Sequence, residues 1–182
     1  MLFQIVSLLL DVACGLLTGV CLLRLYMQMQ RISFSNPVGQ MVFALSDWLV
    51  LPLRRLVPAA GRWDLSCLIG ALLAQLLHYG LLAVIFGVGT GLLFPFILAL
   101  FGVLRVAVTG LMGLIIANSV LSWVQTRSPI SGVIERLCAP ILNPLRRVIP
   151  LLGGIDFSPL VALLALQVVT IVLGNLQMRM LT

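Results

Sequence analysis

Four long apolar stretches, separated by shorter segments of mixed character, set the pattern of this chain. They run from about Leu2 to Met27, Asp64 to Gly87, Val103 to Val124 and Ser158 to Met178. A helix needs about 20 apolar residues to cross the roughly 30 Å hydrocarbon core of a bilayer. Each stretch therefore predicts a transmembrane helix, and together they predict an all-α membrane protein built around a four-helix bundle.

Two shorter segments repeat apolar positions at helical spacing but are too short to span. The first covers Pro37 to Val50, where Asn36-Pro37 is a helix start signal and Pro52 is expected to end the helix. The second covers Ile130 to about Leu142, after the similar start signal Ser128-Pro129. Both segments predict amphipathic helices that lie at the membrane interface.

The segment 88–102 is rich in glycine and carries Pro95 within an apolar run. It is too short for a hairpin of two full spans. We expect a short re-entrant or interfacial segment, and a complete extra span is the second interpretation.

The chain repeats itself at an offset of 92 residues. Between Asn36 and Gln75, thirteen positions are identical to the residue 92 positions later, without a gap. The polar matches carry the argument, because apolar matches are common in any membrane protein. They are Arg54 with Arg146, Arg55 with Arg147, Asp64 with Asp156, Ser66 with Ser158 and Gln75 with Gln167. We expect two tandem repeats of the same orientation, 1–87 and 103–182, joined by the connector 88–102.

The double-arginine motif of each repeat lies between prolines. Its bounds are Pro52 and Pro58 in the first copy, and Pro144 and Pro150 in the second. An aspartate follows nine residues after the second arginine of each motif: Asp64 and Asp156. We expect an arginine–aspartate pair to fix each loop to the start of the next span. Asp64 or Ser66 is expected to cap the second span, and Ser158 the fourth, with Pro159 at its first position.

Composition supports a membrane protein and excludes other classes. The chain is 62% hydrophobic and only 9% charged, whereas soluble domains carry roughly 25% charged residues. Its net charge is +6, and all basic residues are arginines near the ends of apolar runs. Loops rich in arginine tend to remain on the cytoplasmic side of a membrane, and this tendency explains the positive charge. Nucleic-acid binding explains it less well, because it needs a solvent-exposed basic surface.

Arginine placement also predicts the topology. The loop 28–63 carries Arg31, Arg54, Arg55 and Arg62, and the loop 125–155 carries Arg127, Arg136, Arg146 and Arg147. Both loops, and the short helices in them, are expected on the cytoplasmic side of a bacterial inner membrane. Both termini are then expected outside.

These features together resemble the YggT family of bacterial and plastid membrane proteins. The resemblance rests on the paired Asn/Ser-Pro, Pro-Leu-Arg-Arg-x-x-Pro and Asp-x-Ser stretches and on Ser122-Trp123. The two copies differ where Cys67 corresponds to Pro159. The resemblance implies a multi-pass protein with no known catalytic activity. It also implies an association with tolerance of osmotic or envelope stress and, in plastid relatives, with assembly of membrane complexes.

Two interpretations of the arginine motifs remain open at the sequence level. Arg54, Arg55, Arg146 and Arg147 are candidates for binding lipid head groups or an acidic partner. Alternatively, they anchor the interface while their aliphatic stems cover apolar surface.

Among the polar residues inside the predicted spans, the candidates for a functional role are Asp11, Gln75, His78, Arg105 and Gln167. Asp11 and Arg105 are expected at similar depth, which suggests an ion pair between the first and third spans. Gln75 and Gln167 are repeat partners that would face each other across a pseudo-twofold axis. His78 is expected to be a packing residue.

No catalytic motif is visible, and one histidine with four scattered cysteines does not make a metal site. We therefore expect no cofactor and a non-enzymatic scaffold or assembly factor that contacts lipids and protein partners. The alternative is a small channel or transporter used in osmotic adjustment. The sequence leaves open whether the chain forms a homo-oligomer.

Overall fold

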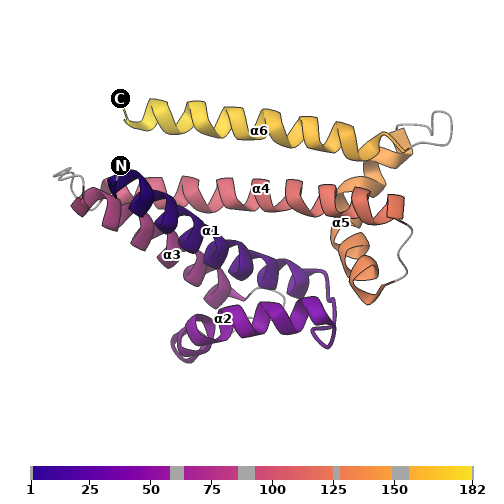
Figure 1. Ribbon diagram of the computed structural model, residues 1–182, viewed down its shortest axis with the longest axis horizontal. Coiled ribbons are helices and arrows are strands. Elements are labelled where there is room, and N and C mark those ends of the chain that lie inside the picture. The colour runs from indigo at the N-terminus through magenta and orange to yellow at the C-terminus, as the bar shows by residue number, and fades with distance from the viewer. Residues whose placement is uncertain (1, 58–63, 86–92, 125–127, 149–155, 182) are drawn as a thin grey trace.

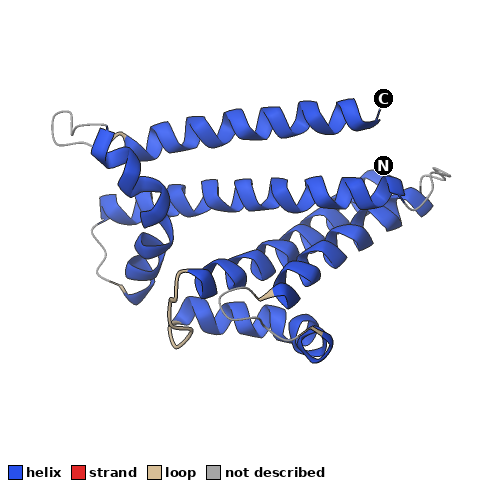
Figure 2. Ribbon diagram, turned by 180° about the vertical axis from the view of Figure 1, so that it is seen from behind, coloured by secondary structure: helices blue, strands red, loops and turns tan. Residues whose placement is uncertain are grey.

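The computed structural model describes residues 2–57, 64–85, 93–124, 128–148 and 156–181. Six helices follow one another, and no strand occurs among these residues (Figure 2). They are α1 (Leu2–Met29), α2 (Pro37–Leu56), α3 (Leu65–Ile85), α4 (Leu93–Val124), α5 (Pro129–Val148) and α6 (Ser158–Leu181).

Four of these helices are long and apolar enough to cross a membrane. The apolar spans cover Gln4–Met29, Leu65–Ile85, Phe94–Val124 and Ser158–Met180. Few of their side chains are buried against other helices, as expected when lipid covers the remainder. The four predicted spans are therefore confirmed, and the chain is a multi-pass membrane protein.

Helix α4 begins about ten residues earlier than the sequence predicted. Residues 93–102 were expected to form a separate re-entrant or interfacial segment, but they are the first turns of α4. Pro95 is tolerated because the first turn of a helix leaves its N–H groups without intrahelical partners anyway. Residues 88–92 lie outside the described part of the chain.

Three of the long helices pack on one another, and the fourth lies to one side of them. Helices α1, α3 and α4 contact one another, and α6 packs on α4 (Figure 1). Figure 1 shows α6 on the side of α4 that faces away from α3. The predicted four-helix bundle is wrong in this respect, because α6 contacts only one of the other long helices extensively.

Three buried clusters hold the long and the short helices together. Cys21, Val50, Cys67 and Val103 join α1 and α2 to α3 and α4. Met27, Val42 and Leu137 join α1 to both short helices, and the Tyr26 hydroxyl donates to the Leu137 carbonyl at 2.8 Å. Ile115, Cys138, Leu142 and Ala162 join α4, α5 and α6.

The two short helices extend further than predicted. Helix α2 continues through Pro52 to Leu56, and α5 continues through Pro140 and Pro144 to Val148. An internal proline removes one backbone hydrogen bond and bends a helix without always ending it. Both helices are visibly bent in Figure 1. The prediction that Pro52 ends its helix is wrong, and the double arginines lie in the last helical turns.

Two of the four predicted start signals cap their helices as expected. Asn36 caps α2 by accepting the Gly39 N–H at 2.8 Å, and Ser128 accepts the Ser131 N–H at the start of α5. Ser158, however, is the first residue of α6 and not its cap. The Asp156 carboxylate accepts the Ser158 N–H at 2.9 Å instead.

Candidate functional site

The first double-arginine motif ties the end of α2 to the start of α3. The Arg54 Nε donates to the Asp64 Oδ2 at 3.0 Å, and its Nη2 donates to the same oxygen. The Ser66 hydroxyl donates to the Val57 carbonyl at 2.6 Å, directly after α2. Ser66 therefore satisfies a carbonyl at the end of one helix and does not cap the next.

The second motif repeats this ion pair between α5 and α6. The Arg146 Nε donates to the Asp156 Oδ2 at 2.8 Å. The hydroxyl of Ser158 is buried without a hydrogen-bond partner in the described part of the chain, so it does not repeat the role of Ser66. The expected arginine–aspartate pairs are present, but each uses the first arginine of its doublet.

The two pairs differ in their exposure to solvent. The Asp64 side chain is 0% exposed, whereas that of Asp156 is 28% exposed. Burial alone raises the pKa of the Asp64 carboxyl, but the hydrogen bonds and charge of Arg54 outweigh it and hold the pKa below its usual value. Burial alone also raises the pKa of Asp156, but the hydrogen bonds from the Ser158 N–H and Arg146, with the charge of Arg146, together lower it. Both carboxylates are therefore stabilised in their charged form.

The second arginine of each doublet is left to solvent. Arg55 and Arg147 are exposed, and neither makes an ion pair or a side-chain hydrogen bond with the described residues. Successive helical residues point about 100° apart, so two adjacent arginines cannot both face the same aspartate. Each motif thus presents one arginine held by the fold and one that is open to a ligand.

A cavity of about 290 Å³ lies between the α1–α2 connection and the start of α5. Ser33 and Asn36 line it from one side, and Pro129, Gly132 and Arg136 line it from the other. Arg136 is the charged residue of this lining.

The model of a known protein family matches most of this chain. The family model CCB3/YggT matches residues 3–85 and 97–177, which include both arginine motifs, the first two spans and most of the other two. The chain belongs to the CCB3/YggT family. Each of the two matched segments contains two long helices and one short helix.

Several relatives in this family are similar over most of their length. YggT of Escherichia coli (strain K12), described as uncharacterized, is 38% identical over 162 residues, covering 88% of this chain and 85% of that protein. An uncharacterized Vibrio alginolyticus protein from the proC 3' region is 33% identical, covering 86% of each. An uncharacterized Haemophilus influenzae protein is 31% identical, covering 81% and 79%. No solved structure matches.

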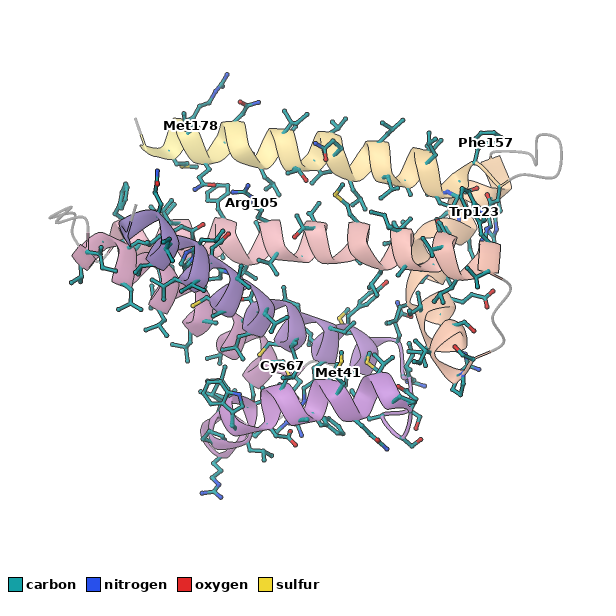
Figure 3. All side chains as sticks on the ribbon, viewed as in Figure 1. Met41, Cys67, Arg105, Trp123, Phe157 and Met178 are labelled. Carbon is teal, nitrogen blue, oxygen red and sulfur yellow. The ribbon has the colours of Figure 1, made fainter. Side chains whose placement is uncertain are left out.

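The predicted pair between Asp11 and Arg105 is not formed in this CCB3/YggT chain. Both side chains are exposed, and no ion pair joins them. Arg105 extends from α4 toward α6, whereas Asp11 lies on α1 (Figure 3). Similar depth along two spans does not determine how each helix is rotated about its axis, and so it could not predict whether the two side chains meet.

The predicted meeting of Gln75 and Gln167 is also wrong. Gln75 is buried and donates to the Thr18 hydroxyl of α1 at 3.1 Å, whereas Gln167 is exposed on α6. A Cβ atom added at Gly102 would overlap the Gln75 side chain, so this glycine allows α4 to approach α3 closely. His78 is buried against the ring of Tyr79, as expected of a packing residue.

The sequence did not reveal the role of Arg24, which the fold buries. Its guanidinium is 2% exposed and donates to Ser46 and Asp47 of α2, each at 2.7 Å. It also lies 4.6 Å above the centre of the Phe43 ring. A single arginine within an apolar span, followed by one aspartate in the next helix, is the signal that could have predicted this pair.

Proposed function

We propose that this protein is a non-enzymatic scaffold or assembly factor of the bacterial inner membrane, linked to tolerance of envelope or osmotic stress. In this proposal two tandem repeats of the same orientation place α2 and α5 at the cytoplasmic interface. Both termini lie outside. The arginines left open by the fold then bind anionic groups of a membrane protein partner or of lipid.

One observation carries this proposal. Each double-arginine motif uses its first arginine to hold an aspartate, while Arg55 and Arg147 remain exposed. An exposed guanidinium at the end of a helix binds carboxylate or phosphate with two parallel hydrogen bonds. Structural anchoring alone needs only the first arginine of each motif, so the second arginine is available for recognition.

Site-specific crosslinking in native membranes tests this role. Arg55 and Arg147 are each replaced by a photo-reactive amino acid in the full-length protein, and crosslinked products are identified by mass spectrometry. We expect both positions to capture the same protein, and charge reversal of the other arginine to reduce capture about tenfold.

The control is the same photo-reactive residue at Leu164, which lies exposed on α6. Lipid adducts should dominate there. If positions 55 and 147 give only the products seen at position 164, the exposed arginines do not contact a protein partner and the scaffold proposal fails.

The channel alternative loses the contact that favoured it. A pore requires polar residues of several helices to line one path, and Gln75 and Gln167 were the pair expected to meet there, but Gln75 bonds to Thr18 and Gln167 is exposed on α6. We therefore do not propose transport.

A further inference from the structure

Helix α2 has two apolar faces, of which only one is covered by the rest of the chain. Val42, Ser46 and Val50 are buried against α1 and α3. The other face carries Met41, Ala44, Leu45, Trp48 and Leu51, all exposed. Trp48 is 65% exposed. Because these residues recur every three or four positions, they form one continuous stripe, which we call the α2 outer face.

The exposed surface of α5 has a different composition. The residues 92 positions after Met41 and Leu45 are Val133 and Leu137, which are buried, whereas those after Ala44, Trp48 and Leu51 are Arg136, Pro140 and Asn143, which are exposed. Glu135 is exposed beside them. Helix α5 thus folds with polar side chains on its exposed surface, so an exposed apolar stripe is a property of α2 and not of both short helices.

Charged residues near the two surfaces differ in whether they form ion pairs. Asp47 borders the α2 outer face, and its carboxylate is paired with the buried Arg24 at 2.7 Å. On α5, Glu135 and Arg136 form no ion pair with the described residues. A charge beside lipid chains must be paired or must reach the head groups, as the long side chain of Arg55 can at the end of α2, whereas a charge in water need not be paired.

Trp48 is also adapted to an apolar surrounding. Its indole N–H donates to the Leu45 carbonyl of its own helix at 2.8 Å. The ring therefore brings no unpaired donor into a medium where such a group would cost several kcal/mol. In water this internal bond would add little, because the solvent would serve as acceptor.

The arrangement of the helices places the two surfaces in different positions. Helix α2 runs alongside the second half of α1, whereas α5 lies across the end of α4 (Figure 1). Helix α2 also packs on α3, which exposes Leu65 and Leu68 at its start. The α2 outer face therefore extends the apolar surface of the spans, which lipid covers.

From these observations we infer that the α2 outer face contacts the hydrocarbon chains of the bilayer, with Trp48 among them, while the outer surface of α5 faces water. The occupant of the α2 outer face is lipid. The inference concerns Met41 to Leu51, whereas the site of the proposed function begins one helical turn later at Arg55, so the two proposals are tested at different residues.

Fluorescence quenching of Trp48 tests this inference. Trp63→Phe and Trp123→Phe leave Trp48 as the sole tryptophan of the full-length protein, reconstituted in vesicles of phosphatidylcholine and phosphatidylglycerol. We expect lipids brominated on their acyl chains to reduce Trp48 emission about threefold, as for a tryptophan at the acyl boundary. Aqueous iodide should have almost no effect.

The matched control moves the tryptophan to the other short helix. Pro140→Trp, in a chain that also carries Trp48→Phe, places it 92 residues later, and Asn143→Trp serves if that variant does not fold. Iodide, and not brominated lipid, should quench these controls. Quenching of Trp48 by iodide as strong as in the controls would place the α2 outer face in water. Protection of Trp48 from both quenchers would mean that protein covers the α2 outer face. Either result overturns the inference.

Discussion

Asp64→Asn is expected to lower the stability of the protein in detergent by about 2 kcal/mol, the usual contribution of a hydrogen bond to a charged group. The substitution removes the negative charge that holds two donors of Arg54 and joins α2 to α3. Because Asp64 is fully buried, water cannot replace the lost interaction. Thermal unfolding measured by circular dichroism in one detergent gives the difference.

Asp156→Asn is the matched control, since Asp156 holds the corresponding arginine but remains partly exposed. Exposed ion pairs contribute only about 0–1 kcal/mol, so the effect should be clearly smaller. Equal losses of stability in the two variants would show that burial of Asp64 does not matter.

The same pair predicts how stability depends on pH. The folded-state pKa of Asp64 lies below that of an unfolded aspartate, which is about 3.9. Its stabilising effect is therefore complete above that value and is lost as the pH falls through the folded-state pKa. Asp64→Asn should lower Tm near neutral pH and flatten the decline of Tm below about pH 4. An unchanged acid decline in the variant would contradict this assignment.

Arg24→Ile is expected to destabilise the protein by about 2 kcal/mol, because it removes two charge-assisted hydrogen bonds and leaves Asp47 without its partner. Isoleucine is the natural residue 92 positions later, at Ile116, so the substitution suits this place in a span. The loss should appear as a lower Tm in detergent.

A double substitution separates two contributions to the loss of stability: the unpaired charge of Asp47 and the lost packing of Arg24. Asp47 corresponds to Ala139 in the second half of the chain. Adding Asp47→Ala to Arg24→Ile gives the first half the residues of the second, and it should recover about 1 kcal/mol. If the double variant is less stable than Arg24→Ile alone, then Asp47 contributes to the fold by some contact other than Arg24.

The apolar pattern was sufficient to predict the long helices, because spans need only length and hydrophobicity. It did not predict correctly where the two short helices end, because both contain prolines. Pro52 was expected to end its helix, and the second short helix was expected to end at about Leu142, before Pro144. Packing of α2 and α5 against their neighbours instead holds the helices together across the missing hydrogen bonds. Local propensity carries no information about that packing.

The absence of packing information from the sequence also limited the prediction of the arginine motifs. The spacing of arginines and aspartates predicted the ion pairs, but choosing Arg54 over Arg55 required knowing that α2 is still helical there. Sequence identity at Gln75 and Gln167 suggested symmetric contacts. Thr18, which bonds to Gln75, corresponds to Gly110 on α4, so Gln167 has no equivalent hydroxyl to meet.

We propose that in each double-arginine motif the first arginine stabilises the fold and the second is available to bind a partner. Thermal unfolding of Arg54→Gln, Arg55→Gln, Arg146→Gln and Arg147→Gln in one detergent tests it most directly. Arg54→Gln should lose at least about 2 kcal/mol, because it leaves a buried carboxylate unpaired, and Arg146→Gln should lose less. Arg55→Gln and Arg147→Gln should unfold like the unmodified protein. A loss for Arg55→Gln as large as that for Arg54→Gln would contradict the account.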